Sequence, residues 1–420
     1  MKYIKALTAL KPFMMMGWRN LWRQKRRSLI VMSSIAIGIF AMVLAVGFMN
    51  GVMRQLVENT INTSLGHVAV HRKGFHDSMK VELCFPPERA VLDAVRKNPA
   101  VLSWAPRVKV QGMARSGETA RSVMIVGIDP AAERKTTSLY SYMEKTGGSS
   151  FIEDPSEEGV LISRSLAEVL DCNLGDRLVL MMQDRRGGIA GVGLTVTGFF
   201  RSPSDDFDRH TVFVGIRRLQ EIAGLDDAVS EIMIIGRDRD GADDMKGGIA
   251  AAIGRPDLEV LSWKDMAPSL VSALELQDMM IMIFMAIIFI TIIFSVANTL
   301  IMSIMERFHE LGVMKCVGTR PGQIVFMVLF EAGSLGLAGL ATGIAASLPL
   351  VLVLGQTGLD LSFVADSLRA WGAGSTIYPV VRLKDIVIAA VMVFATALGA
   401  SLYPALKAAR IKPLEALHFI

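Results

Sequence analysis

Four long apolar stretches without a charged residue decide most of what this chain can fold into. They run from Ser28 to Met53, from Met279 to Met305, from Ala332 to Leu359 and from Ile386 to Leu406. Each reaches the roughly 20 residues that a helix needs to cross the hydrocarbon core of a bilayer. Of the 420 residues, 52% are hydrophobic and only 20% are charged, which is unusual for a soluble globular protein. We therefore predict an α-helical membrane protein with four transmembrane helices, over residues 28–53, 279–305, 324–354 and 386–406.

The distribution of basic residues predicts the orientation of these spans. Residues 1–27 contain eight Lys and Arg and no Asp or Glu, and such an excess stays on the cytoplasmic side of a membrane. Four crossings then place residues 54–277 and 355–384 outside, and residues 306–322 and 407–420 inside. The tail agrees with this placement, because Lys407, Arg410 and Lys412 outnumber Glu415.

A cleaved signal peptide would also begin with a basic segment and an apolar run. The run after Arg27 exceeds the roughly 7 to 15 residues of a signal peptide core, however, and no small-residue cleavage site follows it before Asn50. We therefore interpret the first span as an uncleaved anchor.

Within residues 1–27, apolar residues such as Phe13, Trp18 and Trp22 recur at helical spacing among basic ones. This predicts an amphipathic helix on the inner leaflet. The alternative is a basic flank with no defined helix.

The segment 54–277 has ordinary charge density and frequent Gly and Pro, which indicates a large domain outside the membrane. Its patterns predict both strands and helices. The predicted strands are 66–71, 108–114, 121–128, 160–162, 178–182, 194–199 and 258–261, and the predicted helices are 88–97, 165–170 and 242–253. We expect a two-lobed α+β domain in which a block of about 150–235 is inserted into the first lobe.

Residue types that bind metals occur in this domain, but they give little support for a metal site. His67, His71, His76 and Asp77 are donors that zinc accepts. They fall on a predicted strand and on the turn that follows it at Gly74, so we expect no metal site.

The cysteines and the remaining polar residues do not predict an enzyme either. Cys84 and Cys172 lie outside the membrane and far apart in sequence, so a disulfide between them is left open, whereas Cys316 faces the reducing cytoplasm. No nucleophile and base, and no pair of carboxylates, stand in a catalytic pattern. The net charge of +4 is modest and concentrated at membrane edges, so we expect no nucleic-acid partner.

The segment between the second and third spans has a helical pattern of its own. Phe308, Leu311 and Met314 recur at helical spacing, and Gly318 with Pro321 supplies a stop signal. This predicts a short amphipathic helix within 306–322, on the cytoplasmic surface. From the residues alone, the helix either caps the bundle of spans or docks a partner.

Several motifs in family order resemble those of one group of proteins. They are Asn298-Thr-Leu300, Met305-Glu-Arg307, Glu310-Leu-Gly-Val-Met-Lys315, Val126-Gly-Ile-Asp-Pro130, the Gly-rich run from Glu331 to Gly339 and the tail from Tyr403 to Leu417. With these motifs the chain resembles the FtsX/MacB-type ABC transporter permeases, which include the lipoprotein-releasing LolC and LolE proteins. The resemblance covers nearly the whole chain, including one span before the outer domain and three after it.

The resemblance implies a MacB-like periplasmic core domain and two protein partners. One is a second permease subunit, identical or different, and the other is a cytoplasmic ABC ATPase. The family's ATPase-docking positions correspond here to Glu306, Arg307, Glu310, Lys315 and Gly318.

The chain departs from the family pattern at Phe308 and His309, where the family more often has polar or basic residues. No Gly-x-x-x-x-Gly-Lys-Ser/Thr motif occurs in the sequence, so nothing predicts a phosphate-binding loop. We therefore expect no directly bound cofactor, with ATP used by the partner subunit.

Three residues of the third span attract attention. Glu331 lies about two turns inside the span, where an ionised carboxylate is costly and suggests a functional site. The alternative is a structural contact with a neighbouring helix or with the inner interface. Gly339 and Gly343 form a pair of small residues one turn apart, which lets another helix approach closely, so we expect a packing role.

The leading function is that of a permease subunit in the bacterial inner membrane, which couples a separate ATPase to movement of the outer domain. Its expected substrate is lipid-anchored or amphiphilic, and lipoprotein release is the most specific expectation. The alternatives are a MacB-like efflux permease and an FtsX-like regulator of cell-wall hydrolases. The outer domain of FtsX is usually much smaller than residues 54–277, which favours transport.

Overall fold

The computed structural model describes residues 12, 14–19, 22–23, 25–144 and 148–410. These residues divide into two compact units. The helical unit falls within 1–52, 275–359 and 377–420, and the sheet unit within 53–274 and 360–376. Much of the predicted N-terminal amphipathic helix, and the tail from 411 on, lie outside the described residues.

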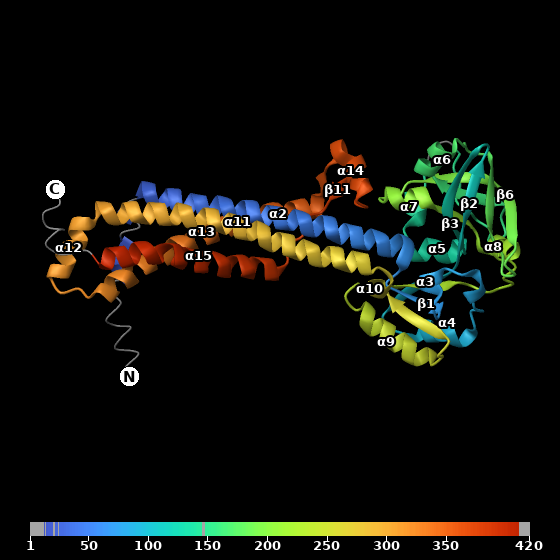
Figure 1. Cartoon of the computed structure of the whole chain (residues 1–420), viewed down its shortest axis with the longest axis horizontal. Coiled ribbons are helices and arrows are strands. Elements are labelled where there is room, and N and C mark those ends of the chain that lie inside the picture. The colour runs from blue at the N-terminus through green and yellow to red at the C-terminus, as the bar shows by residue number, and fades with distance from the viewer. Residues whose placement is uncertain (1–11, 13, 20–21, 24, 145–147, 411–420) are drawn as a thin grey trace. The chain divides into compact units, whose positions relative to one another are not determined.

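Four long helices make up most of the helical unit. They are α2 (Lys25–Thr60), α11 (Pro268–Glu306), α13 (Pro321–Thr357) and α15 (Leu383–Ala409). All four are long and apolar enough to cross a membrane, as predicted, and they run side by side in Figure 1. Buried residues from each, such as Ile35, Met285, Leu335 and Val393, form one apolar core.

Three of these helices are longer than a bilayer requires. α2 has 36 residues, α13 has 37 and α11 has 39, which at 1.5 Å per residue exceeds the roughly 30 Å of hydrocarbon by about 25 Å. The predicted spans 28–53, 324–354 and 279–305 lie inside them. The last turns of α2 and the first turns of α11 belong to the sheet unit.

A short helix, α12 (Phe308–Cys316), connects α11 to α13. Gly318 has a φ of 99°, a left-handed conformation that favours glycine, and Pro321 is the first residue of α13. Glycine and proline thus end one helix and begin the next.

A nine-stranded sheet dominates the described part of the sheet unit, in the order β3-β7-β4-β6-β5-β2-β8-β1-β9. The strands are β1 (Val68–Arg72), β2 (Val101–Ser116), β3 (Thr119–Ile128), β4 (Gly159–Ser163), β5 (Arg177–Gln183), β6 (Ile189–Phe200), β7 (Thr211–Gly215), β8 (Glu231–Gly236) and β9 (Leu258–Ser262). The long strand β2 pairs with β8 through its first half and with β5 through its second. It therefore links the two ends of the sheet.

Short helices accompany this sheet. They are η1 (Ile61–Leu65), α3 (Phe75–Ser78), η2 (Val81–Leu83), α4 (Arg89–Lys97), α5 (Pro130–Thr136), η3 (Leu139–Tyr142), α6 (Arg164–Leu170), α7 (Asp205–His210), α8 (Ile216–Ala223), α9 (Ala242–Ile253) and α10 (Trp263–Met266). Each predicted strand and helix of 54–277 coincides with one of these elements, and the prediction of a mixed domain of strands and helices is confirmed. The division into two lobes stays a prediction.

The segment between α13 and α15 has more structure than a loop. It contains β10 (Leu359–Asp360), η4 (Ser362–Val364), α14 (Ala365–Ala370) and β11 (Thr376–Ile377). Arg369 of α14 donates to the fully buried carboxylate of Asp208 at 2.9 Å. This buried ion pair explains why residues 360–376 fold as part of the sheet unit.

Candidate functional site

An apolar groove lies between α2 and α11 in the helical unit, with a volume of about 460 Å³. Its lining residues are Ala45, Val46, Phe48, Met49, Met280, Ile281, Ile283, Phe284 and Ile287. All nine side chains are apolar, so the groove suits an apolar chain and offers nothing to an ion. Its volume is within the range of small-molecule sites.

A polar cluster, which we call the collar, adjoins this groove in sequence and consists of the buried residues Asn50, Gln277 and Asp385 and the partly exposed Arg382. Asn50 donates to Asp385 at 2.9 Å, and Gln277 donates to Asn50 at 3.2 Å. Arg382 donates to Asp385 at 3.1 Å. Because buried polar groups need partners, these bonds fix α2, α11 and α15 relative to one another at this level.

The short helix that the sequence predicts within 306–322 begins at a different residue from the one expected. Glu306 is the last residue of α11, whereas the sequence suggests that it opens the coupling helix. Arg307 has φ −102° and ψ 15°, which interrupts the helix, and α12 begins at Phe308. The guanidinium of Arg307 lies 3.3 Å from Glu331 and 3.4 Å from Glu310, and these two ion pairs hold it at the break.

Two further ion pairs connect this segment with the beginning of α2. Arg27 donates two hydrogen bonds to Glu306, at 2.6 and 2.5 Å. Arg23 lies 2.8 Å from Glu310. Both arginines therefore face the segment that joins α11 to α12.

All four charged residues predicted to meet an ATPase therefore have partners within the chain. The fourth, Lys315, donates to the carbonyl of Ala409 at 2.8 Å. Their docking role stays a prediction.

The opposite faces of α12 differ sharply. Leu311 is buried with Ile324 and Met327, and Phe308 and Met314 pack against this cluster. The other face exposes His309, Val313, Cys316 and Val317, of which Val317 is 82% exposed. The motifs in the sequence do not single out this exposed face, although residues 309, 313 and 317 have helical spacing.

The two glycines of α13 lie where α2 crosses it. A Cβ atom on Gly339 would be 2.7 Å from the Cβ of Ile35, and one on Gly343 would be 2.8 Å from the Cβ of Ile39. Backbone carbonyls of α2 lie almost as close, at 3.2 and 2.9 Å. Such separations leave room for hydrogen only.

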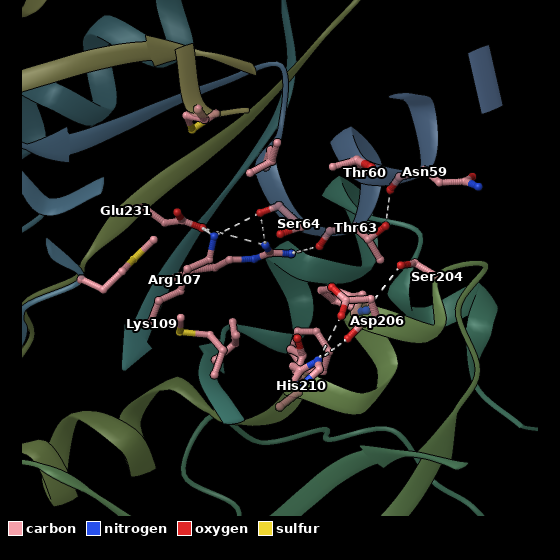
Figure 2. Close-up of a pocket in the computed structure, with 18 of the residues that line it drawn as sticks. Asn59, Thr60, Thr63, Ser64, Arg107, Lys109, Ser204, Asp206, His210 and Glu231 are labelled. Atoms are coloured by element: carbon pink, nitrogen blue, oxygen red, sulfur yellow. Dashed lines mark hydrogen bonds and ion pairs between the residues drawn. The ribbon is translucent and has the colours of Figure 1, made fainter. Parts of the chain in front are cut away.

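A cavity of about 410 Å³ in the sheet unit contains a cluster of buried charges (Figure 2). Arg107 and Lys109 come from β2, on the same side of the strand because they are two residues apart. Arg107 donates to Glu133 of α5 at 2.5 and 3.3 Å. Lys109 lies 2.8 Å from Glu231 of β8.

The same two cations bind the end of the chain segment that continues α2. Arg107 donates to the carbonyls of Thr63 and Ser64, each at 3.1 Å, and Lys109 donates to Ser64 at 3.1 Å. Cations are favourable at the C-terminal end of a helix, where carbonyls lack partners. We call Arg107, Lys109, Glu133 and Glu231 the clamp.

The clamp contains two cations and two carboxylates, and all four side chains are buried or nearly so. Burial by itself raises the pKa of Glu231, but Lys109, His71 and Arg107 outweigh burial and lower that pKa to about 2. Burial lowers the pKa of Lys109. The cations of the clamp are thus committed to carboxylates and carbonyls, so the cluster is suited to holding η1 in place.

The histidines considered as metal ligands have other contacts. His71 lies 3.2 Å from Glu231, and His67 accepts a hydrogen bond from the backbone of Gly236 at 3.1 Å. Within the described part of the chain, no group of three or more His, Cys, Asp and Glu is placed to hold a metal ion.

The two cysteines of the sheet unit are free and buried. Burial raises the pKa of Cys84 to about 12 and that of Cys172 to about 11, which keeps both as thiols. The disulfide left open by the sequence is absent from this structure.

Two family models together match most of the chain. Residues 28–252 match the MacB-like periplasmic core domain, and residues 282–413 match the FtsX-like permease C-terminal region. The first match alone covers more than half of the chain, so the protein belongs to this family of ABC transporter permeases, and the resemblance seen in the sequence is confirmed.

Relatives match the chain along almost its full length. The lipoprotein-releasing system transmembrane protein LolC of Xylella fastidiosa is 24% identical, over 94% of this chain and 96% of its own. LolE of the same system in Haemophilus influenzae is 21% identical, over 97% and 99%. An ABC transporter permease of Methanocaldococcus jannaschii is 20% identical, over 96% of each chain.

Proposed function

We propose that this chain is the permease subunit of an ABC transporter that releases lipid-anchored proteins from the bacterial inner membrane. Its relatives LolC and LolE belong to lipoprotein-releasing systems and match it almost from end to end. The observation that carries the proposal within this chain is the wholly apolar groove between α2 and α11. Acyl chains are the part of a lipoprotein that such a groove accommodates.

The proposal includes an arrangement in the membrane. Residues 1–27, α12 and the tail from Lys407 face the cytoplasm, and a two-lobed sheet unit lies in the periplasm. A second permease subunit, identical or different, completes the transporter. A separate ATPase on the cytoplasmic side supplies the energy.

The docking helix of the proposal is α12 with its flanks, including Gly318. Glu306 and Glu310 bind Arg27 and Arg23, so their first role is to fix the junction of α11 and α12 to the basic residues at and just before the start of α2. The ATPase then contacts the exposed face of α12 that contains Val313 and Val317. Polar edges of the ion pairs remain accessible, because the side chains of Glu306 and Glu310 are 45% and 42% exposed.

Filling the groove tests the transport proposal. Ala45→Trp places an indole in the groove, and Ala41→Trp, on the same helix one turn earlier, is a matched control because Ala41 is exposed and does not line the groove. We expect Ala45→Trp to reduce the lipidated protein that copurifies with the transporter by about tenfold, equivalent to about 1.4 kcal/mol. Mass spectrometry identifies and quantifies the bound protein.

ATP-dependent release from spheroplasts should fall in parallel, while Ala41→Trp leaves both quantities unchanged. If Ala45→Trp retains the wild-type amount of lipidated protein, the groove is not the acyl-chain site. If a small amphiphile or a cell-wall hydrolase copurifies in place of lipidated protein, the chain is an efflux permease or a regulator.

Docking is tested by Val317→Asp, with Val364→Asp as control because that valine is an exposed residue of the sheet unit. We expect Val317→Asp to weaken copurification of the ATPase at least tenfold without lowering permease abundance. An unchanged yield of ATPase would place the docking surface elsewhere.

A charge exchange separates the two roles of Glu306. Glu306→Arg should lower the thermal stability of the permease, and adding Arg27→Glu should restore it, because the exchanged pair keeps opposite charges. If the double variant is stable but still fails to bind ATPase, Glu306 also contacts the ATPase directly.

A further inference from the structure

The basic residues at and just before the start of α2 face two different directions. Arg23 and Arg27 point to one side and pair with Glu310 and Glu306. Lys25 and Arg26 lie on another side, exposed, and line a second apolar groove of about 430 Å³. In the described part of the chain, neither of these two has an ion-pair partner.

This second groove is apolar along its length and charged at one end. Its lining residues are Trp18, Trp22, Lys25, Arg26, Ser28, Leu29, Met32, Ser334, Leu335 and Ala338. Residues 334, 335 and 338 come from one face of α13, whereas residues 29 and 32 come from α2. Two helices therefore form the walls, and Trp18, Trp22, Lys25 and Arg26 line the remaining part.

The aromatic residues that line this groove are of a type found at lipid interfaces. Trp18 and Trp22 contact each other edge to face, with ring centroids 6.4 Å apart, and remain 54% and 61% exposed. Tryptophan prefers the interface between hydrocarbon and headgroups. The boundary of the membrane is therefore expected at the charged end of this groove.

We propose that the groove binds one anionic phospholipid, with an acyl chain along Leu29, Leu335 and Ala338 and the headgroup phosphate at Lys25 and Arg26. Charge complementarity selects this occupant, since the apolar walls alone would accept any lipid. Basic pockets between membrane helices are suited to anionic headgroups. The site is separate from the groove between α2 and α11, so the proposal does not depend on lipoprotein release.

Such a lipid would stand beside the ion pairs that hold α12. Lys25 and Arg26 lie between Arg23 and Arg27 in sequence, so a bound phosphate would reduce the repulsion among the four cations. The lipid would thereby favour the arrangement in which Arg23 and Arg27 pair with Glu310 and Glu306.

The two tryptophans make the site measurable in the full-length protein. The permease is placed in nanodiscs that contain equal amounts of two lipids, one anionic, phosphatidylglycerol, and one zwitterionic, phosphatidylcholine. In one preparation the anionic lipid carries bromine on its acyl chains, and in the other preparation the zwitterionic lipid does. Bromine quenches tryptophan fluorescence on contact. The signal of a variant with both Trp18→Phe and Trp22→Phe is subtracted, which removes the fluorescence of the other three tryptophans.

We expect the anionic lipid to be preferred over the zwitterionic one by up to about thirtyfold. This is about fivefold for each of the two cations, which corresponds to about 1 kcal/mol per basic residue at room temperature. Lys25→Ala with Arg26→Ala should abolish the preference. Arg320→Ala with Lys407→Ala is the control, because it removes two exposed cations that do not line the groove. This control should keep the preference.

Ala338→Trp tests the apolar part of the site while both cations remain, with the exposed Ala345→Trp as control on the same helix. Ala338→Trp should lower the preference at least fivefold. Equal quenching by the two lipids would overturn the proposal. A preference that survives Lys25→Ala with Arg26→Ala, or survives Ala338→Trp, would overturn it too, because charge attraction would then act without this groove.

Discussion

Replacing Arg107 by methionine should destabilise the sheet unit by about 3–5 kcal/mol. Arg107 is 1% exposed and Glu133 is fully buried, so the substitution leaves a carboxylate in the interior without its cation. Removing one partner of a buried ion pair typically costs this much, because the remaining charge stays desolvated. Among the residues that the structure describes, only Thr137, whose hydroxyl lies 2.8 Å from Glu133, would still donate to the carboxylate.

The double variant Arg107→Met with Glu133→Met separates the ion pair from the other bonds of Arg107. Without either charge the pair itself should contribute little, since apolar replacement of a buried pair is often neutral. The carbonyl of Thr63 still loses its bond to Arg107. We therefore expect the double variant to recover part of the loss and to remain about 1–3 kcal/mol below the wild type.

Two measurements follow these changes in the full-length protein. Denaturant unfolding, monitored through the fluorescence of Trp104 on β2, gives the free energies for the cycle. Hydrogen exchange of peptides covering residues 53–66 reports on the clamp itself and should accelerate in Arg107→Met. If the coupling energy between the two substitutions is below about 1 kcal/mol, or if exchange at 53–66 does not change, the clamp does not hold η1 as described.

Three other predictions can be checked directly. Gly339→Ala should cost about 1–3 kcal/mol through overpacking against Ile35, whereas Gly399→Ala, with no atom within 4 Å of its Cβ, should change stability by less than about 1 kcal/mol in thermal melts. The pKa of Glu231 in the folded protein is about 2 against an ordinary value of about 4.3, so the stability that its charge contributes is present above about pH 5 and is lost as the pH falls toward 2. This contribution is about 3 kcal/mol at most. Glu231→Gln should remove this acid dependence from unfolding curves. The exposed Cys316 should resist a membrane-impermeant maleimide in intact spheroplasts and react after permeabilisation, whereas Glu118→Cys should react in intact spheroplasts, and the opposite pattern would reverse the orientation.

The four spans could be predicted because the bilayer imposes a length and an apolar composition that a single sequence displays. The strands β7 and β8 were not predicted, and both are short apolar runs whose type periodicity alone does not decide. The sequence predicts residues 355–384 only as a loop outside the membrane, because nothing in it reveals Asp208, the buried residue that binds Arg369. Long-range partners of this kind leave no local pattern.

The clamp is a second case in which the sequence does not reveal the long-range partners of a residue. Arg107 and Lys109 alternate with Pro106, Val108 and Val110 in β2, and this is a signal that two cations face the same side of the strand. Their carboxylate partners are Glu133, 26 residues away from Arg107, and Glu231 on β8. Only the pairing of β2 with β8, and the packing of α5, brings these charges together.

The docking residues illustrate a second kind of limit. Glu306 and Glu310 match Arg27 and Arg23 in their four-residue spacing, but Glu306 and Arg27 are 279 residues apart in sequence. A family motif identifies such positions without showing which of their contacts are internal. The exposed face with Val317 becomes visible only when the buried face of α12 is known.

The distribution of charge along α2 limits how the helical unit recognises a substrate. Ion pairs occupy its beginning at Arg23 and Arg27, and the collar at Asn50 fixes its far part. Between them, residues 28–49 contain no charged side chain. A ligand beside this stretch is therefore selected mainly by length, width and apolarity, because no side chain of the stretch can form an ion pair with it. Discrimination between lipid-anchored proteins that have the same acyl chains must then come from polar contacts made outside the groove, and loss of such contacts should alter the choice of protein without altering the affinity for the lipid anchor.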